Sequence, residues 1–338
     1  MKEKKRRMKA EWEPQHCVQL TWPHAQTDWA SMLPEISAVY QAMAHQISLR
    51  EPLLIVGPTA PQPPVPNATF AALDTNDTWA RDHGFITVEE DGQLVLLDFQ
   101  FNGWGQKFRA DLDNALNRQL YDLGLLTGRY EPHLDFVLEG GSLESDGRGT
   151  VFTTACCLLA PHRNQPLSRQ DIEARLKLWL GADRIVWLEH GSLLGDDTDG
   201  HIDTLARFAP GGIILYTGCD DPDDEHFEPM QKMEEQLKQF TDIDGNHYHL
   251  IKLPLPDACY DEISRLPATY ANFLVTNSQV LVPIYGQPVK DVEACRLIGE
   301  AFPGRKVTGI DCRALICQHG SLHCATMQLP SGSLNTNH

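Results

Sequence analysis

Cysteine, histidine and carboxylate side chains recur in short polar segments at similar places along this chain of 338 residues. A thiolate is a strong nucleophile, an imidazole transfers protons near neutral pH, and buried carboxylates can hold a cation. Together they would suit an attack on a cationic substrate, with a tryptophan as pocket wall. The candidate residues are Trp79, Asp82, Glu139, His201, Asp203 and Cys324.

Each candidate taken alone also has an ordinary structural explanation. Cys324 is one of nine cysteines, and Trp79 would suit a hydrophobic core. Asp82 follows an arginine, as in many surface ion pairs, and His201 would suit a half-buried place on an alternating strand. Glu139 precedes two glycines, which permit a turn as readily as a close backbone approach. The shared place of these residues in a repeated unit is what favours a common function.

The segment DDTDGHID suggests a metal centre as an alternative. Asp197, Asp199, His201 and Asp203 offer oxygen and nitrogen ligands, so a metal-dependent hydrolase is the competing hypothesis. An EF-hand loop centred on Gly200 fails, because its first and twelfth positions would be glycine and alanine instead of aspartate and glutamate. The cysteines and histidines near the C-terminus lack the paired spacing of structural zinc sites. We predict that the protein uses no metal and no organic cofactor.

The elements that must position these residues form a repeat. Five amphipathic helical patterns begin at intervals of about sixty to seventy-five residues, and a short apolar run that predicts a buried strand follows each one. A polar segment comes next, and in four units a pair of hairpin strands follows. The helices are expected to begin near Pro34, Arg109, Ser168, Pro229 and Pro288, and the apolar runs cover residues 53–56, 136–138, 185–188, 249–253 and 306–310.

Local signals support these elements. Ser168 and Asp171 form the pattern of a capping box, and Gly181 would end that helix. Turns are expected at Asp91–Gly92, Asp146–Gly147, residues 210–212 and residues 277–278. Five such units around one axis would bring their polar segments to one place.

The two ends of the chain complete the predicted architecture. The fifth unit lacks a strand, and Cys17–Trp22 has no helix before it, so we expect that segment to pair with Ser321–Leu329 and close the ring. The domain prediction is a basic N-terminal extension at residues 1–9, frayed over Lys2–Arg7, one catalytic domain at residues 10–330 and a flexible tail at residues 331–338. The predicted fold class is α/β.

Composition narrows the class of protein. A net charge of −18 argues against nucleic acid as a partner and suits a cationic substrate. No run of residues is long and apolar enough for a membrane span, and the basic start lacks the apolar stretch of a signal peptide. Nine irregularly spaced cysteines suit a reducing cytoplasm. The acidic DDPDDE loop is expected to be exposed and remote from the site.

Six segments in order resemble the family of agmatine deiminases and bacterial, Porphyromonas-type peptidyl-arginine deiminases, which modify guanidines. The resemblance runs from about Ala10 to Pro330. It implies a five-bladed α/β propeller of ββαβ modules with pseudo-fivefold symmetry, in agreement with the repeat. The segments are AEWEPQHCVQLTWP, TWARDHG, EGGS, DTDGHIDTLARF, YANFLVTNSQVLVPIYG and SLHCATMQLP.

The resemblance assigns a role to each candidate residue. Cys324 corresponds to the nucleophile and His201 to the general acid and base. Asp82 and Asp203 correspond to the carboxylates that hold the guanidinium, and Glu139 to a third one that also orients the histidine. Trp79 corresponds to a tryptophan in the pocket wall. The residues just before Cys324, Gln318–Ser321, replace a glycine run of the family, so the far end of the substrate is not defined by the resemblance.

The expected reaction is hydrolysis of agmatine to N-carbamoylputrescine and ammonia, in polyamine (putrescine) synthesis, through a covalent cysteine thiouronium intermediate. Deimination of arginine or peptidyl-arginine by the same residues is the alternative, and transfer of the amidino group to an amine is a further one. A guanidine-binding module without catalysis is the remaining hypothesis. The resemblance is compatible with a homodimer.

Overall fold

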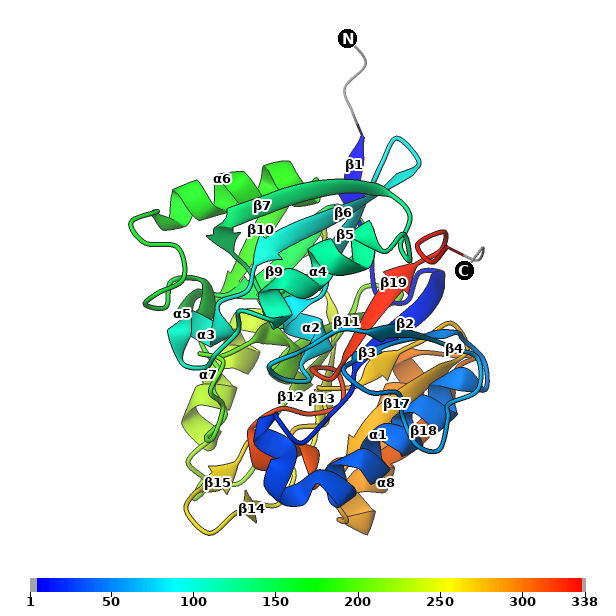
Figure 1. Cartoon of the computed structure of the whole chain (residues 1–338). Helices are drawn as coiled ribbons and strands as arrows, with labels where there is room; N and C mark the ends of the chain where they lie inside the picture. Colours follow the sequence, from blue (N-terminus) through cyan, green and yellow to red (C-terminus); the bar gives the residue numbers. More distant parts are fainter. Residues whose placement is uncertain (1–4, 336–338) are drawn as a thin grey trace.

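A computed structural model describes residues 5–335, in which helices alternate with small mixed sheets (Figure 1). The strands are β1 (Arg6–Met8), β2 (Gln15–Thr21), β3 (Leu53–Gly57), β4 (Ala68–Ala72), β5 (Ile86–Glu90), β6 (Gln93–Gln100), β7 (Arg129–Val137), β8 (Glu144–Ser145), β9 (Thr150–Thr154), β10 (Arg184–Leu188), β11 (Ala206–Ala209), β12 (Ile213–Thr217), β13 (His249–Leu253), β14 (Cys259–Tyr260), β15 (Arg265–Leu266), β16 (Leu274–Val275), β17 (Gln279–Ile284), β18 (Lys306–Asp311) and β19 (Thr326–Pro330).

The helices include five long ones, as the sequence predicts, and several single turns that lie near the polar segments. The α-helices are α1 (Leu33–Ser48), α2 (Ala80–His83), α3 (Gly103–Gln106), α4 (Asp113–Asp122), α5 (Ala155–Leu158), α6 (Arg169–Leu180), α7 (Phe227–Leu237) and α8 (Pro288–Ala301). The 3-10 turns are η1 (Asp28–Met32), η2 (Gly140–Ser142), η3 (Ile202–Thr204) and η4 (Leu315–Gln318). No helix within residues 5–335 has the length and apolar character needed to span a bilayer.

One strand pattern recurs five times. In each case an antiparallel pair is followed by a long helix that leads into a strand parallel to the second member of the pair. The pattern occurs in β5–β6–α4–β7, β8–β9–α6–β10, β11–β12–α7–β13 and β16–β17–α8–β18. The fifth copy is split between the chain ends, since β19 pairs antiparallel with β2 and α1 leads to the parallel β3.

The expected contact between the chain ends is therefore present. Thr326 lies opposite Leu20, and Leu329 lies opposite Cys17. Figure 1 shows the blue β2 beside the red β19. In the other four units the antiparallel strand comes from the unit's own hairpin. In the last unit β19 takes this place, so all five units have the same set of strands.

The predicted caps and turns are also present. Ser168 and Asp171 form both hydrogen bonds of a capping box at the start of α6, and Gly181 ends that helix with a φ of 66°. The turn at Asp91 and Gly92 joins β5 to β6, and both residues have positive φ. The first residues of α1 and α8 include a proline, which the first turn of a helix tolerates.

Three expectations about element ends need correction. The second long helix begins at Asp113 rather than near Arg109, and the strand expected at residues 136–138 is the longer β7, Arg129–Val137. The basic extension is not frayed over Arg6–Met8, because β1 pairs with β5 and the Arg6 guanidinium contacts Glu131. Residues 1–4 lie outside the described residues.

The described part of the predicted tail contacts the body of the chain. Leu334 forms a bridge with Leu126, and the backbone N–H of Thr127 donates to the carbonyl of Ser333. These contacts bind residues 333–335 to the segment after α4. Residues 336–338 lie outside the described residues.

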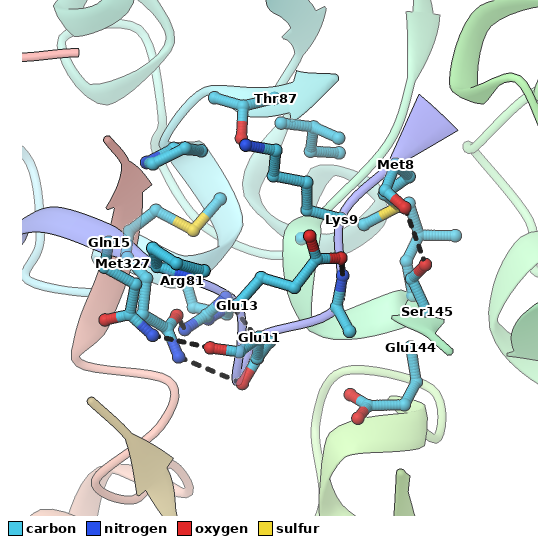
Figure 2. Close-up of a pocket in the computed structure, with 17 residues that line it drawn as sticks. Met8, Lys9, Glu11, Glu13, Gln15, Arg81, Thr87, Glu144, Ser145 and Met327 are labelled. Carbon is cyan, nitrogen blue, oxygen red and sulfur yellow. Dashed lines mark hydrogen bonds and ion pairs between the residues drawn. The ribbon is translucent and has the colours of Figure 1, made fainter. Parts of the chain in front are cut away.

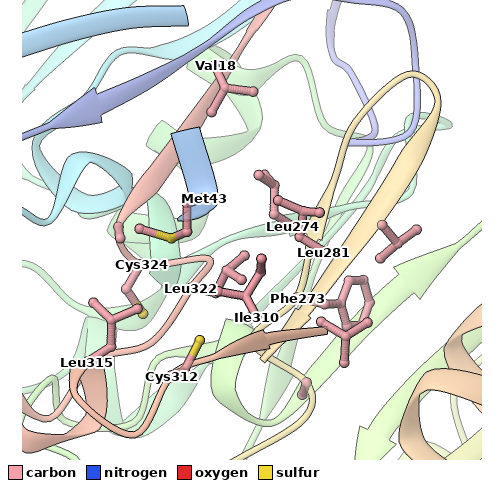
Figure 3. Close-up of a cluster of buried hydrophobic side chains, with 14 of the residues drawn as sticks. Val18, Met43, Phe273, Leu274, Leu281, Ile310, Cys312, Leu315, Leu322 and Cys324 are labelled. Carbon is pink, nitrogen blue, oxygen red and sulfur yellow. The ribbon is translucent and has the colours of Figure 1, made fainter. Parts of the chain in front are cut away.

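The largest hydrophobic cluster reaches the nucleophile candidate. Strands β2, β3 and β17 and helices α1 and α8 contribute buried side chains to this cluster, and Cys324 belongs to it (Figure 3). Leu315 and Leu322 are also members and are fully buried. Cys324 therefore lies where a packed core meets the polar site, which limits the movement of its side chain.

Candidate active site

Short turns at the ends of sheet strands carry the candidate residues. Asp82 lies in α2, Glu139 precedes η2, His201 precedes η3, and Cys324 lies just before β19. His201 is not on a strand, as one explanation of the sequence supposed, and it is fully buried. The backbone N–H of Arg81 donates to the carbonyl of Cys324 at 3.1 Å, so the first and last of these turns are joined directly.

The sulfur of Cys324 is held by an amide and faces a carboxylate. Asn272 Nδ2 donates to Sγ at 3.3 Å, and Asn272 Oδ1 also accepts from the backbone N–H of His323 at 2.9 Å. Asp203 Oδ2 lies 3.8 Å from Sγ. The sequence placed Asn272 in the equivalent polar segment but gave no reason to select it, because its contact with the sulfur depends on the packing of β16 against the last turn.

Asp203 belongs to a buried chain of polar contacts that leads away from the sulfur. His323 Nδ1 lies 2.7 Å from Asp203 Oδ2, and His323 Nε2 lies 2.8 Å from Glu11 Oε1. Arg207 also contacts His323 and forms an ion pair with Glu144. Burial opposes ionisation of Asp203, yet the hydrogen bond and charge of His323 hold the pKa of Asp203 below its usual value. His323 thus keeps Asp203 ionised and oriented.

His201 lies between two carboxyl groups. Its Nδ1 is 3.6 Å from Asp82 Oδ1, and its Nε2 is 4.0 Å from Glu139 Oε2. Burial disfavours the imidazolium, but Asp82, Cys157 and Glu139 together raise the pKa of His201 well above its ordinary value. The histidine is therefore prepared to donate a proton at neutral pH.

Gly141 shows how closely these groups converge. A Cβ at this position would lie 2.6 Å from His201 Nδ1, 2.8 Å from Asp82 Oδ1 and 3.2 Å from Asp203 Oδ2. Its backbone N–H donates to Asp82 Oδ1 at 3.0 Å. The close backbone approach suggested by the two glycines after Glu139 is therefore present at the second of them.

Glu139 is as deeply buried as Asp203 and His201, and none of these three residues lines the open pocket. The Oε1 atom of Glu139 is 2.8 Å from Arg163 Nε. Arg163 also contacts Asp199 Oδ2 at 2.9 Å. Glu139 is not among the residues that line the open pocket, so its nearest partners are His201 and Arg163.

A second tryptophan lies at the site, which the sequence did not indicate. Trp104 Nε1 donates to Asp82 Oδ2 at 2.9 Å. It lies between two glycines, and all three residues have positive φ. That backbone is uncommon for a tryptophan, and strain of this kind is often retained where a side chain must be aimed at a site.

The open pocket is acidic and has aromatic walls. Its aromatic lining residues are Trp79, Trp104 and Phe108. The other lining residues are Asp28, Asp77, Asp82, Asp197, Thr198, Gln318, His319, Gly320 and Cys324. Gly320 is needed here, because a Cβ would overlap the ring of Trp79. Neither lysine nor arginine is among these lining residues, whereas four of them are aspartates.

Without a bound cation, the pocket favours the protonated, neutral forms of several of its own acidic side chains. Burial and the charges of Asp203 and Asp82 raise the pKa of the Cys324 thiol well above its ordinary value. Burial, with Asp196 nearby, raises the pKa of Asp197 to about 6, and burial raises that of Asp77 to about 7. A positively charged ligand would reverse these shifts, because it stabilises each ionised group.

A second cavity lies beyond Asp203 and has a different character. It is bordered by the N-terminal segment and by Arg81, Glu144 and Met327 (Figure 2). Its charged groups bind one another: Glu11 accepts from Arg81 at 3.0 Å and from Gln328 Nε2 at 3.0 Å. Cys324 and the two tryptophans do not line it, so the chemistry belongs to the acidic pocket.

The acidic segment before His201 does not form the proposed metal centre. Asp199 contacts Lys107 and Arg163, and Asp203 contacts His323. Within residues 5–335, the side chains whose ligand atoms gather closely are Glu139, Cys157 and His201. The lysine, arginine and histidine contacts of these aspartates are thus structural or positioning contacts.

Comparison with known proteins identifies the family. The model of the Porphyromonas-type peptidyl-arginine deiminases matches residues 7–330. The chain belongs to this family. It is 32% identical to the agmatine deiminase of Stutzerimonas stutzeri strain A1501 over 354 residues, which covers 96% of this chain and 95% of the relative.

Solved structures of family members have the same fold. A Porphyromonas gingivalis protein provisionally named as an arginine deiminase is 48% identical, with a TM-score of 0.94 over 98% of this chain and all of that one. A cysteine-to-serine variant of the agmatine deiminase from C. jejuni, solved with substrate bound, is 38% identical, with a TM-score of 0.93 over 98% of each chain. The mixed α/β fold of this chain is therefore that of the family.

Proposed function

We propose that this protein hydrolyses agmatine to N-carbamoylputrescine and ammonia. The observation that carries the proposal is the pocket that leads to Cys324, whose described lining includes four aspartates and neither lysine nor arginine. Agmatine carries a positive charge at each end, so it suits a pocket that is acidic along its length. Arginine carries a carboxylate, which such a lining would repel.

Asp82 and Asp203 would hold the guanidinium with its carbon facing the sulfur. Paired charge-assisted hydrogen bonds fix a planar guanidinium well, and Asp203 Oδ2 already lies 3.8 Å from Sγ. The bound cation would lower the raised pKa of Cys324, and the Asn272 amide would donate to the thiolate. Substrate binding would thus generate the nucleophile.

In the first half of the reaction, Cys324 Sγ forms a bond to the guanidinium carbon. His201 gives its proton to the leaving nitrogen, the C–N bond breaks, and ammonia departs from an S-alkylthiouronium. In the second half, His201 takes a proton from water, and the hydroxide adds to the same carbon. The C–S bond then breaks and the proton of the added hydroxyl passes to the departed ammonia or to solvent, which restores the thiolate and leaves the ureido product. No redox change occurs.

The proposal also covers the propeller architecture, the extent of the catalytic domain and the cytoplasmic location. The five units would surround one axis as blades of an α/β propeller, with the pairing of β2 and β19 completing the last blade. One catalytic domain would cover residues 10–330, in agreement with the extent of the family match. All nine cysteines are free, which suits a cytoplasmic enzyme.

Arginine or peptidyl-arginine deimination is the second candidate, because a relative provisionally named as an arginine deiminase shares 48% identity. Purified protein should be incubated with agmatine, with arginine and with an arginine-containing peptide, and ammonia and ureido product measured. We expect kcat/KM to be highest for agmatine. A higher value for arginine or the peptide would replace the proposed substrate.

Cys324→Ser tests the covalent mechanism with the same assay. We expect turnover to fall below detection while agmatine still binds, because a serine hydroxyl ionises far less readily than a thiol. Cys156→Ser removes an exposed thiol and serves as the matched control, which should retain activity. Turnover by Cys324→Ser that matches the control would contradict the mechanism.

A further inference from the structure

A second thiol lies beside the proposed acid–base residue and takes no part in the reaction described above. Cys157 is fully buried in the single turn α5. Its sulfur, a ligand atom of Glu139 and a ring nitrogen of His201 all lie within 4.8 Å of one another. Sulfur, oxygen and nitrogen at such distances form the kind of donor set that binds zinc.

The polar atoms of this cluster have fewer hydrogen bonds than burial normally requires. Among the described residues, the carboxylate oxygens of Glu139 and the ring nitrogens of His201 are buried without a nitrogen or oxygen hydrogen-bond partner, and the Cys157 thiol is the hydrogen-bond partner of His201 in this cluster. Arg163 provides a charge contact at Oε1 of Glu139, which leaves Oε2 facing His201 Nε2 at 4.0 Å. Buried atoms that lie this close together and are incompletely satisfied favour a shared ligand.

The three side chains also come from turns that are held in place. Thr154 Oγ1 accepts from the backbone N–H of Cys157 at 3.3 Å and donates to the carbonyl of Gly200 at 2.6 Å. The turn that carries Cys157 is thereby tied to the residue before His201. A site whose ligands are positioned before the metal arrives loses little conformational entropy on binding.

We propose that Glu139, Cys157 and His201 form an inhibitory site for a zinc-like divalent cation. The ligand atoms would close to roughly 3.3–3.8 Å apart around a tetrahedral ion, with water as the fourth ligand. Cys157 would bind as a thiolate and His201 as a neutral imidazole, so each would release a proton to solvent. Thiolate and imidazole favour Zn²⁺ and Co²⁺ over Mg²⁺ and Ca²⁺. An ion bound to His201 would occupy the lone pair that must accept the proton of water, so turnover would stop.

The ligand set can be tested without turnover. Protein carrying Cys324→Ser is titrated with Co²⁺, and the thiolate-to-cobalt charge-transfer band in the near ultraviolet is recorded. We expect the band to appear in Cys324→Ser and in Cys324→Ser/Cys156→Ser, which removes the neighbouring exposed thiol. The band should be absent from Cys324→Ser/Cys157→Ser. If the band is already absent from Cys324→Ser, Cys324 is the thiolate ligand and the proposal is overturned. A band that persists in Cys324→Ser/Cys157→Ser would also overturn it.

A second variant protects this test against misfolding of the Cys157 variant. Glu139→Gln in the Cys324→Ser protein retains both thiolate and imidazole but weakens one ligand. We expect at least a tenfold higher Co²⁺ concentration at half-saturation, with the band still present when the site is filled. An unchanged half-saturation would exclude Glu139 from the site.

The inhibitory effect rests on the proposed deimination, so it is measured separately. Ammonia release from agmatine is followed in protein with native Cys324 at rising Zn²⁺, with each variant scaled to its own metal-free rate. Zn²⁺ should inhibit, EDTA should restore the rate, and Cys157→Ser should raise the half-inhibitory concentration at least tenfold, whereas Cys156→Ser should not. Equal sensitivity of both variants would overturn inhibition through this site. A protein inactive on every guanidine would contradict the proposed function and leave the cobalt result intact.

Discussion

The sulfur of Cys324 lies 3.8 Å from Asp203, and that one carboxylate has two opposing effects. It is proposed to hold the guanidinium, but in the free protein its negative charge helps to raise the pKa of the thiol. Asp203→Asn should therefore lower the thiol pKa and speed alkylation by neutral iodoacetamide at pH 7. The same variant should lose about thirty- to a thousandfold in kcat/KM, since a charge-assisted contact is worth roughly 2–4 kcal/mol. Slower alkylation of the variant would contradict this account.

Two other aspartates that line the pocket predict proton release on agmatine binding. Asp77 and Asp197 have pKa values of about 7 and about 6, so in the free protein at pH 7 a fraction of each carries a proton. A bound dication favours the ionised forms and lowers these pKa values, so agmatine binding should send protons to the buffer. Calorimetric titration of Cys324→Ser in buffers of different ionisation enthalpy measures this release. Asp197→Asn should reduce it, and net proton uptake would refute the assignment.

Among the elements, the turn η2 sets the spacing of the site. Gly141→Ala would place a methyl group 2.6 Å from His201 Nδ1 and 2.8 Å from Asp82 Oδ1, so these groups must move. Since a misplacement of about 1 Å can cost about a hundredfold in rate, kcat/KM for agmatine should fall by at least that factor. Gly57→Ala is the control, because its methyl would make only an ordinary contact, 3.4 Å from Trp22 Cβ. Near-normal activity of Gly141→Ala would show that the site tolerates a wider spacing.

The contact between β19 and the N-terminal segment extends to the site through His323. That side chain separates two carboxylates, Asp203 and Glu11, at 2.7 and 2.8 Å. His323→Phe would leave the buried carboxylate of Asp203 without this partner, which costs roughly 3–5 kcal/mol of unfolding free energy. Chemical denaturation measures that loss, and the pH dependence of kcat/KM reports on Asp203. Because Asp203 would lose the partner that holds its pKa down, we expect activity to be lost at a higher pH on the acidic side than in the native protein.

At the scale of the whole molecule, the net charge of −18 could attract a cation without any specific contact. Asp82→Asn should reduce kcat/KM about thirty- to a thousandfold at any salt concentration, because its charge is buried. Asp223→Asn should change it less than twofold at 0.1 M salt, where exposed charges are screened beyond about 10 Å. Equal effects would favour long-range attraction over a specific clamp.

Asp224, in the same acidic loop, is unsuitable as a second control. The sequence suggested an exposed carboxylate, but Asp224 accepts two hydrogen bonds from Arg265, at 3.0 and 2.8 Å, and one from His226. Its replacement would disturb the fold as well as the charge. Oligomeric state, including the homodimer, stays a prediction.

The five-unit pattern and the order of the candidate residues could be predicted from the sequence alone. Helix caps, turn residues and apolar periodicity are local signals, so α6, the turn at Asp91–Gly92 and β13 could be predicted without knowledge of distant partners. The extent of the family resemblance could also be predicted from the sequence, because it depends on which residue types occur and in what order. The pairing of β1 and the contacts of residues 333–335 could not be predicted in this way, because they depend on segments far along the chain.

Which side-chain atoms of the site face one another could be established only from the tertiary structure. Trp104 binds Asp82, Asn272 holds the sulfur of Cys324, and His323 orients Asp203. Asn272 and His323 lie in the repeated polar segments, but the sequence gave no reason to select them. Glu139 pairs with Arg163 and lies behind His201 instead of lining the pocket, and Cys157 lies close to both. Side-chain direction and burial are set by the packing of units that are far apart in sequence, and burial in turn decides which of these groups carry charge.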